Sequence, residues 1–525
     1  MKTRAWKRRT TTAAAALLVT VTLTPSAPAA TETGPGAAPA GPDLAGSAGL
    51  DRFHQQQLDW TGCAQDPDDV VGQALDASGA QCAEVLVPLD YAEPDGRTIT
   101  VSISRLEAAD PAARVGPLLL NGGGPGGTGL DMVLHMGASE AVAGAYDLIG
   151  MDPRFVGRST PLDCGWPVGH WVSSPGSGKN PLGFLRDAAA MRDLAKRCSR
   201  TEGEVLPFAT TRNTARDMDV IRVALGEKSL SYLGYSYGTY LGQVYSAMFP
   251  GRTDRMVLDG VTDSSGYHPR LLQGATEANE EALREWAGWA AERDGQWGLG
   301  STQEEVLGTL QGIMDAAARK PLRVGDGYRV DDHVFPSLLL NLVVSDLEEA
   351  RVAMAESLQV LHRAAERKPA DPGPLLEQLL EFLLTGTRSH YGSVQTAILC
   401  GDVAAPRSPG VYWRDSLRAR QAAPFFGALT HNITPCAFWD RPVEAPTVID
   451  NDVPALLVSA TGDTRTFHGG ALALRERWDS SRLVTLDGAY HHAVSFEYGN
   501  ACVDSQVEEY LVSGELPETD PVCTV

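Results

Sequence analysis

Hydrophobic and polar positions follow two different periods along the first half of the chain. Between residues 101 and 258, short apolar runs of strand length are separated by stretches whose apolar residues recur at helical spacing. Strands are expected at residues 101–106, 116–120, 146–150, 229–233 and 255–258. Helices are expected at residues 214–225 and 239–249. This alternation predicts an α/β fold with a mostly parallel, doubly wound sheet.

The alternation stops after residue 260, and the pattern is mostly helical from residue 263 to residue 444. Helical stretches are expected at residues 273–292, 302–318, 334–359 and 374–384. Strand-like runs return at residues 454–459 and 482–486, and a last helix is expected at residues 505–511. The pattern predicts a core at residues 51–262 and 445–525, interrupted by a helical cap at residues 263–444.

The first thirty residues have the pattern of a secretory signal peptide. Five basic residues precede a short apolar run at residues 13–23, and small residues at 27–29 offer a cleavage site. The run is short for a membrane span. Arg8 and Arg9 leave twin-arginine export open. Residues 31–50 are expected to be a linker or pro-segment. We therefore expect a secreted protein without stable membrane association.

Charge and cysteine content agree with this expectation. The formal net charge is −22, and no basic tract follows the leader, so a nucleic-acid partner is not expected. The eight cysteines form four successive local pairs along the chain, and an oxidising compartment favours disulfides over free thiols. The expected pairs are Cys63–Cys82, Cys164–Cys198, Cys400–Cys436 and Cys502–Cys523.

One short motif indicates a nucleophile. The sequence Gly-Tyr-Ser-Tyr-Gly at residues 234–238 lies between a predicted strand and a predicted helix. This is the context of a nucleophile elbow, in which a tight turn presents the serine and requires small residues two positions before and after it. Ser236 is the candidate nucleophile, whereas Ser459 lies within a predicted strand. A serine hydroxyl also needs a base, a group that orients the base, and oxyanion donors.

The acid and the base are expected after later strands. Asp463 follows the strand at residues 454–459, and Asp452, which precedes that strand, is the weaker alternative. Two adjacent histidines follow the strand at residues 482–486. We assign the base to His491 and keep His492 as the alternative. The resulting chain order of serine, aspartate and histidine is that of the α/β-hydrolase fold.

The oxyanion donors are expected to be main-chain N–H groups. One is that of Tyr237, the residue after the nucleophile. The other is expected in the glycine-rich segment at residues 121–127, because glycines let N–H groups approach a ligand closely. Gly124 is the first choice and Gly123 the next. The segment lacks the Gly-Lys-Ser/Thr ending of a phosphate-binding loop. No metal or organic cofactor is implied.

These motifs together resemble proline iminopeptidases and bacterial secreted tripeptidyl aminopeptidases. The glycine-rich segment is similar to their Gly-Gly-Pro-Gly loop, and residues 152–159 are similar to their Asp-x-Arg-Gly-x-Gly-x-Ser segment, with Phe155 where glycine is usual. Two segments depart from the pattern. The family's Asp-x-x-Thr-Pro reads Asp-Thr-Arg-Thr-Phe at residues 463–467, and its Gly-x-Gly-His-Gly reads Gly-Ala-Tyr-His-His at residues 488–492, which aligns the motif histidine with His491.

The resemblance implies a secreted serine aminopeptidase that releases short peptides, tripeptides in particular, from free N-termini through an acyl-enzyme. Such an enzyme must bind an ammonium group, and Glu277, Glu280 and Glu281 on the cap are candidates, although a solvated helix face is the commoner role of glutamate. An esterase, lactonase or amidase acting on a small secreted metabolite is the alternative. A non-catalytic binding module is a third hypothesis, which the four catalytic parts disfavour.

Overall fold

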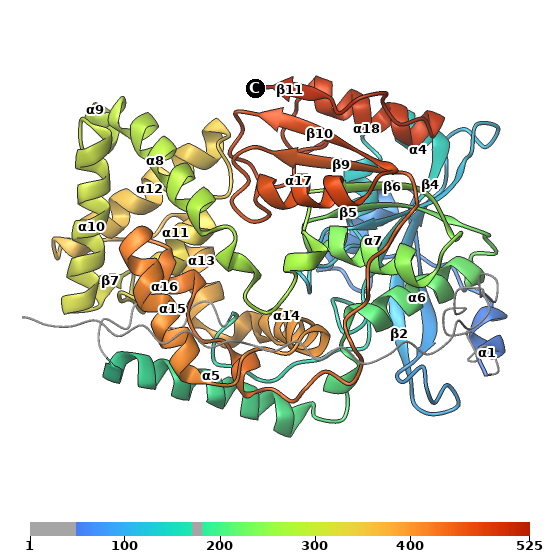
Figure 1. The fold of residues 1–525 in the computed structure, drawn as a ribbon, viewed down its shortest axis with the longest axis horizontal. Coiled ribbons are helices and arrows are strands. Elements are labelled where there is room, and N and C mark those ends of the chain that lie inside the picture. Colours follow the sequence, from blue (N-terminus) through green and yellow to red (C-terminus); the bar gives the residue numbers. More distant parts are fainter. Residues whose placement is uncertain (1–48, 171–180) are drawn as a thin grey trace, which may run out of the picture. The chain divides into compact units, whose positions relative to one another are not determined.

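The computed structural model describes residues 49–170 and 181–525. The predicted signal peptide and nearly all of the predicted linker lie outside the described residues. The main strands are β1 (Gln81–Pro88), β2 (Thr98–Leu106), β3 (Gly116–Asn121), β4 (Tyr146–Asp152), β5 (Leu230–Tyr235), β6 (Thr253–Asp259), β9 (Ala455–Ala460), β10 (Ser481–Asp487) and β11 (Val522–Thr524). They form one sheet in the order β1-β2-β4-β3-β5-β6-β9-β10-β11 (Figure 1). Strand β2 pairs antiparallel with β1 and with β4, and the other neighbouring strands of this sheet pair in parallel, so the expected mostly parallel sheet is confirmed.

Two hydrophobic clusters lie against the opposite faces of this sheet. Successive residues of a strand point to opposite faces, so Leu119 of β3 joins one cluster while Leu118 and Leu120 join the other. The core helices are α1 (Asp51–His54), α2 (Val70–Ala77), α3 (Met132–Met136), α4 (Glu140–Ala145), α5 (Pro181–Thr201), α6 (Thr211–Ala224), α7 (Tyr237–Met248), α17 (His468–Arg477) and α18 (Ala501–Ser513). Helices α6, α7 and α17 bury residues in the first cluster, and α3, α4 and α18 in the second.

A largely helical region lies between β6 and β9 in chain order. Its helices are α8 (Thr276–Ala291), α9 (Asp294–Trp297), α10 (Gln303–Arg319), α11 (Val334–Leu342), α12 (Glu348–Ala365), α13 (Pro374–Leu384), α14 (Ser389–Asp402), α15 (Pro409–Ala422) and α16 (Gly427–Thr430). Most of these helices share a third hydrophobic cluster of their own, whereas α14 buries residues in the first core cluster. A short antiparallel hairpin of β7 (Leu322–Val324) and β8 (Tyr328–Val330), which the sequence pattern did not predict, also belongs to this region. The domain limits of 263 and 444 stay a prediction.

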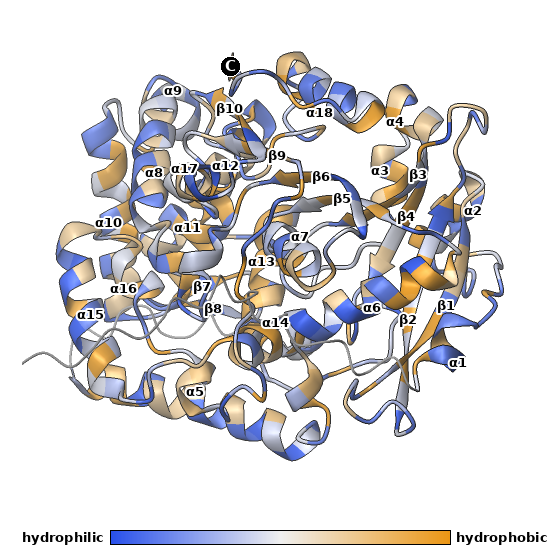
Figure 2. Cartoon of the chain, turned by 45° about the vertical axis from the view of Figure 1, so that its right-hand side comes forward, coloured by the Kyte–Doolittle hydropathy of each residue, from blue (hydrophilic) through white to orange (hydrophobic). Residues whose placement is uncertain are grey.

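Hydropathy follows this layered arrangement. Figure 2 shows hydrophobic residues along the strands of the sheet, and hydrophilic and hydrophobic residues on different faces of outer helices such as α5 and α10. An outer helix of this kind is stabilised mainly by the burial of its apolar face. Among the residues that the structure describes, no helix is long and apolar enough to cross a membrane.

One expected helical stretch is interrupted. Residues 334–359 form two helices, because α11 ends at Leu342 and α12 begins at Glu348. Ser345 and Asp346 lie in the connecting segment, and the Ser345 hydroxyl accepts a hydrogen bond from the N–H of Leu347 at 3.2 Å. Serine and aspartate side chains compete with helical hydrogen bonds in this way. The expectation of one continuous stretch is therefore wrong, and the break turns out to matter for the site.

All four expected disulfides are present, so the predicted pairing is confirmed. Cys63–Cys82 and Cys164–Cys198 lie in the first part of the core, Cys400–Cys436 joins α14 to the segment before β9, and Cys502–Cys523 joins α18 to β11. Each bridge closes a loop of 19 to 36 residues. Closing such loops removes conformations from the unfolded chain, which is worth about 3 to 4 kcal/mol for each bridge in the chain-entropy account.

Candidate active site

Ser236 lies in the turn between β5 and α7, as the sequence predicts. Its backbone has φ 56° and ψ −123°, a conformation that a non-glycine residue rarely adopts. The turn is tight on both sides. A Cβ atom at Gly234 would lie 2.6 Å from the carbonyl oxygen of Gly238, and one at Gly238 would lie 2.8 Å from that of Asn121. The two glycines of the motif are therefore required by contact distances, and Ser236 is one of the residues that line a cavity.

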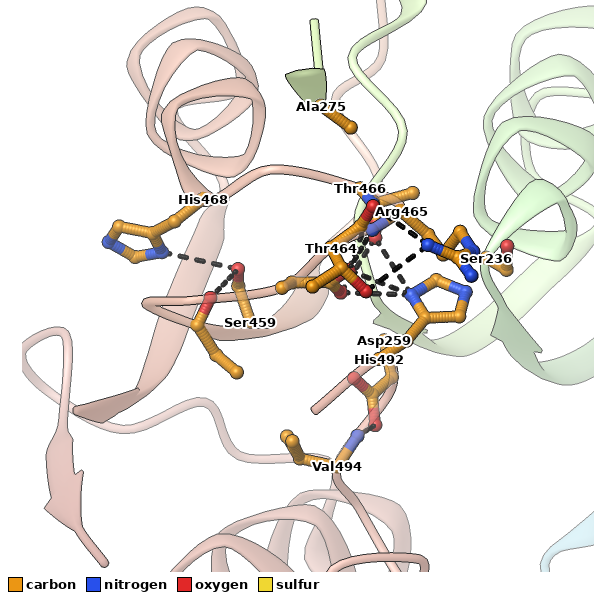
Figure 3. Close-up of polar contacts among 12 residues, drawn as sticks. Ser236, Asp259, Ala275, Ser459, Thr464, Arg465, Thr466, His468, His492 and Val494 are labelled. Atoms are coloured by element: carbon orange, nitrogen blue, oxygen red, sulfur yellow. Dashed lines mark hydrogen bonds and ion pairs between the residues drawn. The ribbon is translucent and has the colours of Figure 1, made fainter. Parts of the chain in front are cut away.

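The structure pairs Asp463 with His492 and not with His491. The Nδ1 atom of His492 lies 2.9 Å and 3.0 Å from the two carboxylate oxygens of Asp463. The Nδ1 atom of His491 instead lies 2.8 Å from the hydroxyl of Ser345. The assignment of His491 as the partner of Asp463 is therefore wrong, and its alternative takes that place. Adjacent side chains leave the backbone in different directions, and Figure 3 shows the His492 ring facing Ser236.

Asp463 is fully buried and held by several donors. The N–H groups of Arg465 and Thr466 donate to its Oδ1 atom at 2.7 Å and 2.9 Å, and the Thr466 hydroxyl donates to Oδ2 at 2.8 Å. Burial alone would raise the pKa of the Asp463 carboxyl, but His492 and these donors together hold it below its ordinary value. The aspartate is therefore ionised beside the imidazole. The alternative acid, Asp452, is exposed on the segment before β9.

The glycine-rich loop packs directly on the serine turn. A Cβ atom at Gly123 would lie 2.5 Å from the carbonyl oxygen of Tyr235 and 3.0 Å from Cβ of Ser236. The N–H of Gly123 already donates to the side-chain oxygen of Asn121 at 3.0 Å. Gly124 and Tyr237 both line the cavity beside Ser236. This geometry favours Gly124 over Gly123 as the second oxyanion donor, and the roles of Tyr237 and Gly124 stay predictions.

Phe155 explains one departure from the family pattern. Its backbone has φ 71°, in the left-handed region that favours glycine. The usual glycine at this position would suit this backbone conformation, and phenylalanine adopts it here with its side chain buried. The carboxylate of Asp152, three residues earlier, accepts hydrogen bonds from the N–H of Gly129, just after the glycine-rich segment, and from the N–H of Arg158, both at 2.8 Å.

Sequence reasoning missed Asp259, the last residue of β6. Its main-chain oxygen accepts a hydrogen bond from the N–H of Ser236 at 2.9 Å. Its buried carboxylate accepts another from the N–H of Val494 at 2.9 Å (Figure 3). It also accepts one from the N–H of Ser495 at 2.6 Å. Asp259 thus links the serine turn to the segment just after His492. The Asp-Gly pair at the end of this strand was the available signal, but it indicated only where the strand–helix alternation stops.

The helix break between α11 and α12 contacts the histidine segment. The carbonyl oxygen of Val344 accepts a hydrogen bond from the N–H of His492 at 3.2 Å. The carboxylate of Asp346 accepts one from the N–H of Tyr490 at 2.9 Å, and Ser345 bonds His491. Three consecutive residues of the helical region therefore hold three consecutive residues of the histidine segment. His491 belongs to this contact between the two regions.

The cavity above Ser236 has a volume of about 350 Å³. Its floor, as we use the word here, consists of Gly124, Ser236, Tyr237 and His492 from the core. Its roof consists of Arg270, Asn341, Tyr391 and Gln395, which lie between β6 and β9 in chain order. None of the described residues that line the cavity is an aspartate or a glutamate.

The three glutamates suggested for binding an ammonium group do not line this cavity. Glu280 is buried, and its Oε1 atom accepts hydrogen bonds from the N–H groups of Phe425 at 2.8 Å and Phe426 at 3.0 Å. Glu281 is exposed and pairs with Arg284. Glu277 lies in the first turn of α8 and is exposed. Nothing in their placement brings a carboxylate to Ser236.

The chain order of serine, aspartate and histidine is kept at the carboxyl ends of β5, β9 and β10. With the sheet and the elbow turn, this order identifies the chain as an α/β-hydrolase of the serine-hydrolase class. Comparison with known proteins agrees. Residues 116–329 match the family model described as alpha/beta hydrolase fold, and residues 423–523 match that of TAP-like proteins.

Three curated relatives align along most of the chain. A tripeptidyl aminopeptidase from Streptomyces coelicolor is 34% identical over 488 residues, which cover 89% of this chain and 86% of the relative. Serine protease Hip1 from Mycobacterium tuberculosis is 29% identical, with 89% and 91% covered. Carboxylesterase B from the same organism is 31% identical, with 95% and 94% covered. The chain therefore belongs to the family of TAP-like α/β-hydrolases, and it is an enzyme.

Proposed function

We propose that this protein is an exported serine peptidase with Ser236, His492 and Asp463 as its catalytic triad. The observation that carries the proposal is the pair formed by His492 and Asp463 on the cavity that also exposes Ser236. Because Nδ1 of His492 faces the carboxylate, the other ring nitrogen is free to accept the proton of the serine hydroxyl.

The reaction follows from this arrangement. The Ser236 Oγ atom attacks the scissile carbonyl carbon while its proton passes to His492. Tyr237 and Gly124 donate their N–H groups to the oxyanion that forms. The protonated imidazole then gives its proton to the leaving amine, which leaves an acyl-enzyme. Water, deprotonated by the same imidazole, attacks the ester and releases the acyl part of the substrate.

We further propose that the acyl part is a short peptide with a free N-terminus, a tripeptide in particular, and that the enzyme acts outside the cell. The relative from Streptomyces coelicolor is named for tripeptide release. The four disulfides and the leader pattern support export. N-terminal sequencing of protein from the culture medium tests export, and we expect the mature chain to begin near residue 30.

A second candidate is an esterase or amidase that acts on a small secreted molecule. Two observations favour it. One relative of similar identity is named carboxylesterase B. The lining residues that the structure describes also include no carboxylate that could hold an N-terminal ammonium group.

A panel of chromogenic anilides separates the two candidates. Free and acetylated forms of alanine, dialanine and trialanine anilides are compared with matched alkyl esters, on the wild type and on Ser236→Ala. The proposal predicts that free trialanine anilide is cleaved at least tenfold faster than its acetylated form. Hydrolysis of esters alone supports the second candidate. A Ser236→Ala loss far below about 10³-fold contradicts both candidates, and so would a failure of a fluorophosphonate to label Ser236.

A further inference from the structure

The cavity carries positive charge without a negative partner on its surface. Two arginines, Arg270 and Arg465, are among the lining residues that the structure describes, and no aspartate or glutamate is. The two arginines differ in how their charge is balanced. Arg270 forms an ion pair with the carboxylate of Asp415 at 2.6 Å. No carboxylate of the described residues lies within 4.0 Å of the Arg465 guanidinium, and its partners are neutral.

The hydrogen-bond partners of the Arg465 guanidinium are all neutral. Its Nη1 atom donates to the side-chain oxygen of Asn279 at 3.1 Å and to the main-chain oxygen of Thr464 at 3.2 Å. Its Nη2 atom donates to the main-chain oxygen of Leu340. Its Nε atom has no hydrogen bond among the residues that the structure describes. Arg465 has intermediate exposure and is one of the residues that line the cavity.

A charged guanidinium in this environment is unfavourable in free energy unless a negative group pairs with it. Removing a charge from water is unfavourable, and hydrogen bonds to neutral carbonyls compensate less than a carboxylate does. Burial lowers the pKa of Arg465 to about 10, although the charge of Asp463 opposes this shift. The guanidinium stays protonated in the neutral range. Its planar fork matches a carboxylate in geometry.

We propose that Arg465 is a specificity-determining residue and forms an anion subsite, so that the preferred acyl group carries a carboxylate. The inference rests on the proposed role of Ser236 and extends it to the class of substrate. Arg465 follows Asp463 by two residues, and Figure 3 shows it beside His492 on the side of Ser236. The carboxylate therefore belongs close to the scissile bond. It is either an aspartate or glutamate side chain of the acyl peptide or the free end of a dicarboxylic monoester.

Matched substrates measure the charge preference directly. Free tripeptide anilides carry glutamate or its neutral isostere glutamine at the first, second or third residue, with alanine elsewhere. The monoester of glutaric acid with p-nitrophenol, compared with the neutral hexanoate ester, tests the second source of the carboxylate. The ratio of kcat/KM for the charged member of a pair to that for its neutral member is the readout. We expect a ratio of about ten or more in the wild type in at least one pair.

Three variants assign the preference to one side chain. In Arg465→Met the ratio should fall to about one or below, because no cation faces the carboxylate. Arg465→Lys keeps the charge and should retain part of the preference, and it also serves if the methionine variant does not fold. Arg270→Met is the matched control, since it removes a cavity arginine whose charge is already balanced, and the ratio should stay near the wild-type value. A merely structural role of Arg465 would lower both members of each pair and leave the ratio unchanged.

The outcomes distinguish this inference from the proposed function. A wild-type ratio of one or less in every pair overturns the inference, and so does a preference that persists in Arg465→Met. If trialanine anilide is cleaved while the ratio is one or less in every pair, the anion subsite is refuted and the peptidase proposal stands. Preference for the glutarate ester without cleavage of any peptide would instead support the anion subsite and contradict the peptidase proposal.

Discussion

The floor and the roof of the cavity are built in different ways. The floor takes Ser236 and His492 from the turns that follow β5 and β10, two parallel strands of the one sheet, and a short motif fixes the backbone of the serine turn. The roof takes Arg270, Asn341 and Gln395 from separate parts of the chain between β6 and β9. A floor of this kind tolerates little change, because contact distances determine it. A roof of this kind can change residue by residue, so relatives with one floor can differ in substrate.

The largest expected effect separates the two adjacent histidines. His492 bonds Asp463 on the floor, whereas His491 bonds Ser345 of the helical region. We expect His492→Ala to lower kcat by about 10³-fold or more, because the general base is lost. His491→Ala should lower it by less than about tenfold. Steady-state kinetics on one chromogenic substrate measures both values, and the reverse ranking would restore the assignment based on the sequence motif.

The sequence indicates the floor well because its determinants are local. Gly234 and Gly238 have no room for a side chain, and this requirement is visible as a motif of five residues. The choice between the histidines is not local. His491 is held by Ser345, which lies 146 residues earlier in the chain. No pattern in the sequence could reveal that contact.

The sequence could not predict which residues form the roof or what charge they carry, for a related reason. A glutamate on a helix indicates nothing about which surface the helix will cover, and Glu280 is in fact used to bond the N–H groups of Phe425 and Phe426. The break at residues 343–347 was hidden in an apolar stretch with helical spacing. The disulfides, by contrast, could be predicted, because each joins cysteines that are neighbours in the order of cysteines along the chain.

The next effect tests how closely the glycine-rich loop packs on the floor. In Gly123→Ala the new Cβ atom would contact the carbonyl oxygen of Tyr235, and φ is 89°. We expect the loop to shift and kcat to fall about 10²-fold, the usual cost of one misplaced oxyanion donor. Gly79→Ala is the matched control, because Gly79 has φ 84° and nothing within 4 Å of the added atom. Similar kinetics for the two variants would contradict this packing.

A smaller effect is expected at the contact between the α11–α12 connection and the histidine segment. Asp346→Ala removes the carboxylate that accepts the N–H of Tyr490, two residues before His492. We expect kcat to fall about threefold to tenfold with KM nearly unchanged, since the base is positioned less well while the cavity surface is kept. Asp371→Ala, at an exposed aspartate of the helical region, is the control. An effect on KM alone would indicate that the segment contacts substrate instead.

The last effect is one of stability and not of catalysis, and it concerns Asp259 beneath the floor. Burial raises the pKa of its carboxyl to about 6, while Ser495 and Val494 oppose that shift. Between about pH 4, its ordinary range, and about pH 6, the folded protein keeps a proton that the unfolded chain has released. The contribution of Asp259 to stability therefore falls as pH rises through this window. An amide side chain cannot ionise, so Asp259→Asn should gain about 1 to 3 kcal/mol relative to the wild type between pH 4 and pH 7.

Urea unfolding with the disulfides intact, at several pH values, gives this difference as a change in the free energy of unfolding. The amide adds a buried donor at the position of Oδ1, which has no hydrogen bond among the described residues, but that cost is the same at every pH. Only the change with pH of the difference in the free energy of unfolding reports the ionisation of the Asp259 carboxyl. Asp452→Asn, at an exposed position, controls for the loss of one negative charge. A flat or falling difference for Asp259→Asn would mean that the carboxyl beneath Ser236 is already ionised at acid pH, and that the floor carries more negative charge than its burial implies.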